Sequence, residues 1–520
     1  MSLMRNFLTV GGSTTTSRLL GFVRDMFMAA ALGTGPVADA FLVAFRFPNL
    51  FRRLFAEGAF ASAFVPLFAR TLEGEGEDAA RRFGSEALSA LFALLVGVTV
   101  LALIGMVPLM MVMAPGFVSD PEKFDLTVML TRIAFPYLTL ISLLALYSGV
   151  LNARGRFFAA AMAPGLLNVV FVAALAYILL SHHENTAEAG VLLSVATLIG
   201  GVLQLGLVMG AAWRDGMLLK LRRPRLTPGV RRLAALAVPG LVAGGVTQIN
   251  IVIGTMIASF APGAIAVLGY ADRLYQLPLG IVGATIAVVM LPDLARHLRA
   301  GRDDLADHTQ NRSLEFAMAL TLPAAIALFI LAKPIVQVIY ERGEFGAADT
   351  LATAHVLMGF AVGLPAFVLI KVFSPGFFAR EDTKTPMWFA AVGVGVNIAA
   401  SLALFPLYGA LGIAIATSIS GWVNAALLGI ALYRRGHFLF DAKVKRNLPL
   451  VLVAALVMGG GVFLAAWWAE PFFADRRMLM RAAAMAAICL AGLAVFAAFC
   501  QLAGVVDFAA VVSKLRKRKG

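Results

Sequence analysis

Long apolar stretches alternate along this chain with short polar connections that are rich in arginine and lysine. A helix needs about 20 apolar residues to cross a hydrocarbon core about 30 Å thick. Stretches of that length predict fourteen transmembrane helices, over 5–33, 37–69, 84–114, 124–153, 157–181, 187–213, 229–260, 263–293, 309–332, 350–379, 385–405, 409–433, 447–470 and 477–504. Several are longer than the membrane requires, which predicts tilted helices or helices that extend beyond it.

Composition and charge support a polytopic membrane protein. Of the 520 residues 60% are hydrophobic and only 14% are charged, and the mean hydropathy is +0.87. The net charge of +14 comes from clusters in the connections, which is a sign of membrane topology and does not indicate nucleic acid binding. Connections and tails on one side carry 29 basic residues and those on the other carry five, which predicts that both termini are cytoplasmic.

An internal repeat divides the predicted helices into two groups. In the first similarity, Arg46 followed by Pro66–Arg70 resembles Arg273 followed by Pro292–Arg296. A second similarity relates Gly149, Arg154 and Asn168 to Gly376, Arg380 and Asn397. Both have an offset near 227 residues. Six spans separate each pair, so the copies share an orientation and are related by an axis along the membrane normal. We therefore predict an all-α protein with two six-helix bundles, 1–215 and 216–440, two additional helices within 441–504 and a basic cytoplasmic tail, 505–520.

Charged residues interrupt the predicted spans. They are Arg18, Arg24, Asp25, Asp39, Arg46, Arg52, Arg53 and Glu57 in the first two spans, and Asp272 and Arg273 in the eighth. A charge at the bilayer centre costs about 2.5–3.5 kcal/mol on insertion scales, so such residues face a bundle interior or a wet cavity and usually have a function. The excess is cationic, and arginine binds phosphate or carboxylate through two parallel hydrogen bonds. The pattern predicts an anion site within the membrane.

For some of these charged residues, a structural role is the alternative to ligand binding. Asp39, Arg46, Arg53 and Glu57 fall on one helical face, where mutual ion pairing is at least as probable as ligand contact. Arg53 lies closer to the cytoplasmic end, where an arginine side chain extends to the interface. Asp25 and Asp272 each adjoin an arginine, and we expect them to position or balance it.

Little else in the sequence indicates chemistry. The histidines lack the spacing of metal ligands, and no Walker loop is present. A membrane enzyme would need an acidic cluster for a metal, and the run Glu73, Glu75, Glu77 and Asp78 is more typical of a solvated loop. We expect a transporter and no enzyme, with no cofactor and no metal site.

Three segments carry a resemblance to a known family. They are Ser17–Asp25 (SRLLGFVRD), Ala38–Phe41 with Arg46–Phe60 (ADAF and RFPNLFRRLFAEGAF), and Tyr270–Leu274 (YADRL). At these residues the chain resembles the MurJ (MviN) family of lipid II flippases, within the oligosaccharidyl-lipid and multidrug exporter superfamily. The resemblance extends over essentially the whole chain.

The resemblance implies a multi-pass protein of the bacterial inner membrane that moves the undecaprenyl-pyrophosphate precursor of peptidoglycan to the periplasmic leaflet by alternating access. It assigns the pyrophosphate to Arg18, Arg24, Arg52 and Arg273. Supporting positions in the cavity or its gates would be Ser17, Asp25, Asp39, Arg46, Asn49, Arg53, Glu57 and Asp272. The last two helices would hold the lipid tail. Lipid II and membrane lipids would be the partners, with cell-wall synthesis proteins as further possible partners and no nucleic acid.

One departure concerns energy coupling. Some family members are described as binding sodium through carboxylates of the second bundle, whereas spans 229–260, 385–405 and 409–433 contain no Asp or Glu. Membrane potential is the simpler driving force, because an inside-negative potential favours outward movement of an anion. Exporters of other lipid-linked oligosaccharides share the expected fold and stay open as an alternative.

Overall fold

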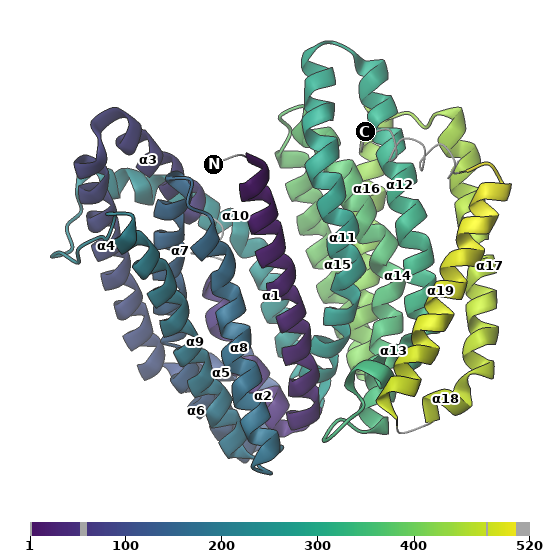
Figure 1. Cartoon of the computed structure of the whole chain (residues 1–520), viewed down its shortest axis with the longest axis horizontal. Coiled ribbons are helices and arrows are strands. Elements are labelled where there is room, and N and C mark those ends of the chain that lie inside the picture. The colour runs from purple at the N-terminus through teal and green to yellow at the C-terminus, as the bar shows by residue number, and fades with distance from the viewer. Residues whose placement is uncertain (1–2, 53–59, 475–476, 506–520) are drawn as a thin grey trace. The chain divides into compact units, whose positions relative to one another are not determined.

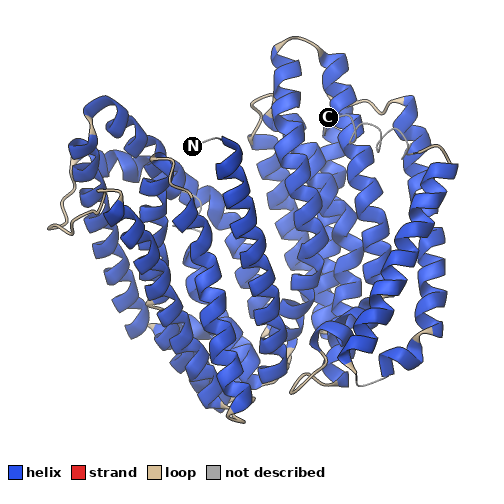
Figure 2. Cartoon of the chain, in the orientation of Figure 1, coloured by secondary structure: helices blue, strands red, loops and turns tan. Residues whose placement is uncertain are grey.

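The computed structural model describes residues 3–52, 60–474 and 477–505. Within these ranges every regular element is a helix and no strand occurs (Figure 2). The helices, labelled in Figure 1, are α1 (Leu3–Leu32), α2 (Pro36–Arg52), α3 (Phe60–Glu75), α4 (Glu77–Ile104), α5 (Met106–Met113), η2 (Pro115–Ser119), α6 (Pro121–Ala134), α7 (Tyr137–Ala153), α8 (Phe158–Leu180), α9 (Ala187–Arg214), α10 (Pro228–Ala258), α11 (Ala264–Arg299), α12 (Asp303–Ile330), α13 (Ala332–Tyr340), α14 (Ala347–Phe378), α15 (Lys384–Tyr408), α16 (Ala410–Arg434), α17 (Ala442–Trp468), α18 (Glu470–Ala474) and α19 (Met478–Leu502).

Each predicted span corresponds to one helix or to a pair of consecutive helices, which confirms the all-α polytopic class. Local sequence explains the breaks within pairs. Gly105 ends α4, and Pro136, which has no N–H to donate, separates α6 from α7. Ten described spans satisfy length and hydropathy criteria for crossing a membrane. Some helices extend past their predicted ends, since α4 begins at Glu77 and α11 continues to Arg299.

The chain folds into two compact units. Unit 1 comprises residues 1–266 and 342–346, and unit 2 comprises residues 267–341 and 347–520. The predicted boundary at residue 215 follows the sequence repeat, whereas packing places the first division at residue 266, because α10 contacts α3, α4 and α5. The repeat itself stays a prediction.

In unit 1, α8 packs against both α1 and α9, and α2 packs against α6. Phe171 of α8 contacts Phe41 and Phe45 of α2 edge to face, with ring centroids 6.1 and 5.4 Å apart. Such aromatic pairs stabilise a core beyond the area that they bury. They hold α2, which carries several of the predicted site residues, against α8.

In unit 2, α14 and α16 pack closely through small residues. The Ser418 hydroxyl donates to the Gly359 carbonyl at 2.6 Å, and a Cβ atom on Gly363 would lie only 2.4 Å from the Ser418 oxygen. Small residues four apart allow this approach, which is the usual way that membrane helices associate. The additional helix α17 packs against α12, and α19 packs against α17 and α13. The basic part of the predicted tail, within 506–520, lies outside the described residues.

Candidate functional site

Arg24 is buried on α1, and all three of its guanidinium nitrogens have a partner. The residue is 8% exposed, and its Nε and Nη2 atoms donate to Asp25 Oδ1 at 3.0 and 2.7 Å. Its Nη1 atom donates to Asn168 Oδ1 of α8 at 3.0 Å, and the guanidinium lies 5.7 Å from the centre of the Phe171 ring. Asp25 therefore balances and orients Arg24 in this structure.

Asn168 joins Arg24 to the preceding turn of α1. Its Nδ2 atom donates to the Ser17 carbonyl at 3.0 Å, and Gly21 faces the same amide. The sequence analysis noted Asn168 only as part of the repeat and did not predict its contact with the arginine. An amide in an otherwise apolar span was the available signal, because such a group needs a hydrogen-bonding partner in the membrane.

The other predicted arginines differ in their surroundings. Arg18, on α1, is exposed, although it is seven residues from the buried Asp25. Arg52 ends α2, and Arg53 and Glu57 lie outside the described residues. In unit 2, Arg273 of α11 is exposed and Asp272 accepts a hydrogen bond from Gln276. The structure therefore brings Ser17, Arg24 and Asp25 together around Asn168.

Asp39 pairs with a residue that the sequence analysis placed in a connection. Its carboxylate is 0% exposed and accepts from Lys123 Nζ of α6 at 2.7 Å. It also accepts from the backbone N–H groups of Gly263 and Ala266, at 2.9 and 3.0 Å, where α11 begins. Asp39 therefore pairs with Lys123 at the start of α6, which differs from the expected mutual pairing of Asp39, Arg46, Arg53 and Glu57.

Arg46 and Asn49, two other polar residues of α2, form hydrogen bonds within unit 1. Arg46 Nη1 donates to the Thr255 hydroxyl of α10 at 3.0 Å, and Asn49 Nδ2 donates to the Phe45 carbonyl at 2.7 Å. Both contacts lie within unit 1. Arg46 thus bridges α2 and α10, which agrees with the packing of α10 in that unit.

Backbone contacts fix the end of α1 that lies nearest Asp39. The Ala30 and Ala31 carbonyls accept from Glu344 N–H and Asn185 N–H, each at 2.9 Å. The backbone at Gly33 has a φ of +56°, and a Cβ atom there would lie 2.5 Å from the Glu344 carbonyl oxygen. The segment 342–346 can approach α1 this closely only because residue 33 is glycine.

The acidic run that could have suggested an enzyme is part of a surface network. Glu77 Oε1 accepts from Arg154 Nη1 at 2.7 Å, and Arg154 also pairs with Asp215. These hydrogen bonds, with Glu77 as the largest cause, raise the pKa of Arg154 above its usual value. The network connects the ends of α4, α7 and α9, which is a structural role.

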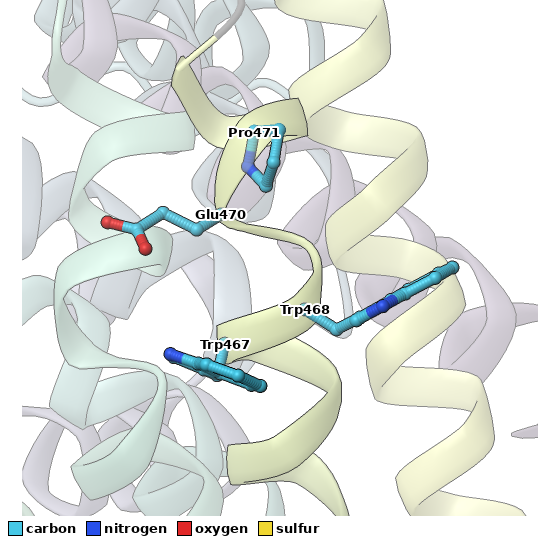
Figure 3. A pocket seen from close by; sticks show the side chains of 4 residues that line it. All are labelled: Trp467, Trp468, Glu470 and Pro471. Atoms are coloured by element: carbon cyan, nitrogen blue, oxygen red, sulfur yellow. The ribbon is translucent and has the colours of Figure 1, made fainter.

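Two cavities among the described residues contain none of the predicted site residues. The larger, about 590 Å³, is lined by Trp467, Trp468, Glu470 and Pro471 where α17 meets α18 (Figure 3). The two indoles are 69% and 78% exposed. Exposed tryptophans at the end of an apolar helix are typical of a membrane–water interface. The smaller cavity, about 350 Å³, lies between α3 and α10.

The all-helical fold, with ten apolar helices among the described residues that are long enough to cross a membrane, defines a multi-pass membrane protein. A family model described as "Lipid II flippase MurJ" matches residues 28–482. The chain belongs to this family. It is 48% identical to "Probable lipid II flippase MurJ" of Rhizobium tropici, over all of this chain and 98% of that protein.

Solved structures agree with this assignment. A structure entitled "Lipid II flippase MurJ, inward closed conformation" aligns with 95% of this chain and 98% of its own, with a TM-score of 0.78 and 25% identity. An inward-facing MATE multidrug transporter of the MOP superfamily aligns with 81% of this chain and 94% of its own, with a TM-score of 0.67. At 16% identity, the second likeness concerns the fold alone.

Proposed function

We propose that this protein moves lipid II from the cytoplasmic to the periplasmic leaflet of the bacterial inner membrane. Membership of the lipid II flippase family is the observation that carries the proposal. The protein is a transporter and not an enzyme. Both termini are placed in the cytoplasm, on the basis of the strong bias of basic residues between the two sets of connections.

The pyrophosphate of the substrate is assigned to Arg18, Arg24, Arg52 and Arg273. The support is chemical, because guanidinium groups bind phosphate oxygens bidentately and keep their charge at every working pH. Exposure of Arg18 and Arg273 favours direct contact with a ligand. Arg24 is bonded to Asp25 and Asn168, and on binding it would have to share or exchange these partners.

Transport proceeds by alternating access, in which the two units rock around the substrate. The proposal also includes cell-wall synthesis proteins as partners and a groove for the lipid tail within 441–504. It gives supporting roles in the cavity or its gates to Ser17, Asp25, Asp39, Arg46, Asn49, Arg53, Glu57 and Asp272.

Complementation tests both the transport function and the arginines. In cells depleted of their own flippase, the wild-type chain should restore growth and the appearance of lipid II in the outer leaflet. Alanine at Arg18, Arg24, Arg52 or Arg273 should abolish both at normal membrane levels, and lysine should restore them only in part, because a point charge replaces a planar fork. Arg299→Ala, at an exposed helix end, is the matched control.

The outcomes separate the parts of the proposal. Failure of the wild-type chain to export lipid II, with transfer of another lipid-linked oligosaccharide instead, would identify the rival exporter. Full activity of all four alanine variants would refute the pyrophosphate assignment while leaving the transport function intact.

A further inference from the structure

The smaller cavity has two walls, and each combines an arginine with apolar residues. The α3 wall presents Ser62, Pro66 and Arg70, and the α10 wall presents Arg232 and Leu236. On each helix these residues are four apart, which places them on one face. The two helices pack against each other within unit 1. The cavity is therefore defined by the packing of one unit.

Both arginines reach the cavity with their charge uncompensated. Arg70 and Arg232 are exposed, and within the described part of the chain neither forms a hydrogen bond or an ion pair with a side chain. Glu73, one turn further along α3, forms no ion pair with Arg70 in that part of the chain. Two like charges lining about 350 Å³ repel each other, and an anion between them would relieve that repulsion.

The second copy of the predicted internal repeat offers a comparison for Arg70. Arg70 ends the motif Pro66-Leu67-Phe68-Ala69-Arg70, whose echo is Pro292-Asp293-Leu294-Ala295-Arg296. In the echo, Asp293 neutralises Arg296 at 2.8 Å. Leu67 occupies the corresponding place in the first motif and lines the cavity. The first copy therefore has an apolar residue, Leu67, at the position where the second copy has Asp293, the acidic partner of its arginine.

An apolar wall beside two free cations suits an amphiphilic anion. Leu236, which lines the cavity one helical turn from Arg232, is 52% exposed, so the α10 wall offers an accessible apolar surface beside a cation. The charge bias assigns this end of α3 and α10 to the cytoplasmic face. We propose that the cavity binds the phosphate headgroup of a membrane lipid on Arg70 and Arg232, with the lipid chain along Leu67 and Leu236.

Native mass spectrometry of the purified full-length protein tests this site without measuring transport, so its result does not depend on the proposed function. The probes are dioleoyl phosphatidylglycerol, undecaprenyl pyrophosphate and dioleoylglycerol, which lacks a phosphate. The wild type should retain the two phosphate lipids in preference to dioleoylglycerol. The double variant Arg70→Gln/Arg232→Gln should retain them about tenfold more weakly, a difference of about 1.4 kcal/mol.

Two further variants make the result specific. Arg222→Gln/Arg225→Gln removes the same net charge from an exposed connection and should leave retention unchanged. Arg70→Lys/Arg232→Lys should give intermediate retention and confirms that the cavity still forms. If the Arg70→Gln/Arg232→Gln variant loses retention of phosphatidylglycerol, the cavity is a general phospholipid site. If it loses retention of undecaprenyl pyrophosphate alone, the cavity is a peripheral substrate site. Retention unchanged in the Gln double variant, or an equal loss in the Arg222/Arg225 control, would overturn the proposal.

Discussion

At the scale of single residues, burial decides what each intramembrane charge does. Asp25 and Asp39 lie in the same part of the sequence and are both buried, yet their partners differ in kind. Asp25 is bonded to the adjacent Arg24 and holds it against α8, whereas Asp39 receives Lys123 and the first backbone N–H groups of α11. An unpaired charge in either place would be costly, so each carboxylate is tied to its cation.

The Asp39–Lys123 pair yields a prediction about stability. Lys123→Met should lower the free energy of unfolding by about 3 kcal/mol, because removing one member of a buried pair leaves the other charge without compensation. Thermal unfolding of the protein in detergent measures the change. Asp39→Asn combined with Lys123→Met should recover part of the loss, and Lys384→Met, at an exposed site, should have little effect. A Lys123→Met protein as stable as the wild type would show that the pair contributes nothing.

At the scale of elements, small residues set how closely helices approach. Gly359 and Gly363 allow α14 to lie against α16, where the Ser418 hydroxyl bonds to the Gly359 carbonyl. The same helices bury Val368, Phe373 and Phe377 in the core of unit 2. This contact therefore supports the packing of the whole unit.

Gly363→Val should disrupt this helix pair. The new Cβ atom alone would fall 2.4 Å from the Ser418 oxygen and 2.9 Å from its Cα atom, so the helices must separate. Overpacking of this kind typically costs about 1–3 kcal/mol. The variant should show lower membrane levels and a lower unfolding temperature in a detergent melt. Gly395→Val, at a position with open space around it, is the control, and equal behaviour of the two variants would contradict the packing argument.

At the scale of the whole molecule, the distribution of charge bears on the driving force. The described helices α10, α15 and α16 contain no carboxylate, and Asp25 and Asp39 are each paired with a cation. Sodium and protons therefore lack an obvious coupling site in these helices. Each elementary charge that crosses 100 mV is worth about 2.3 kcal/mol, which is enough to drive transport of an anion.

We therefore expect transport to follow the membrane potential. An electrogenic ionophore that collapses the potential should stop the appearance of lipid II in the outer leaflet of cells that depend on this protein. Replacing sodium by potassium at a maintained potential should not. Transport that fails on sodium removal with the potential intact would instead indicate a cation site of neutral oxygens, for which Asn397 and Thr417, 3.4 Å apart, are candidates.

The sequence by itself determined the class of protein, because membrane insertion is governed by local properties. The length of an apolar run, the side on which arginines accumulate and the cost of a charge at depth can each be assessed residue by residue. For this reason the apolar spans followed from the sequence, whereas the resemblance to the flippase family came from the motifs at Ser17–Asp25, Arg46–Phe60 and Tyr270–Leu274. The same reasoning singled out Arg24 and Asp25 as a pair.

Tertiary structure alone decided which distant residues meet. Lys123 stands in a connection in the sequence but is buried against Asp39, and Asn168 reaches Arg24 from 144 positions away. Arg46 of α2 likewise meets Thr255 of α10, 209 positions further along the chain. Such pairings depend on how helices pack, and hydropathy and spacing within one helix carry no information about the neighbour that it will contact.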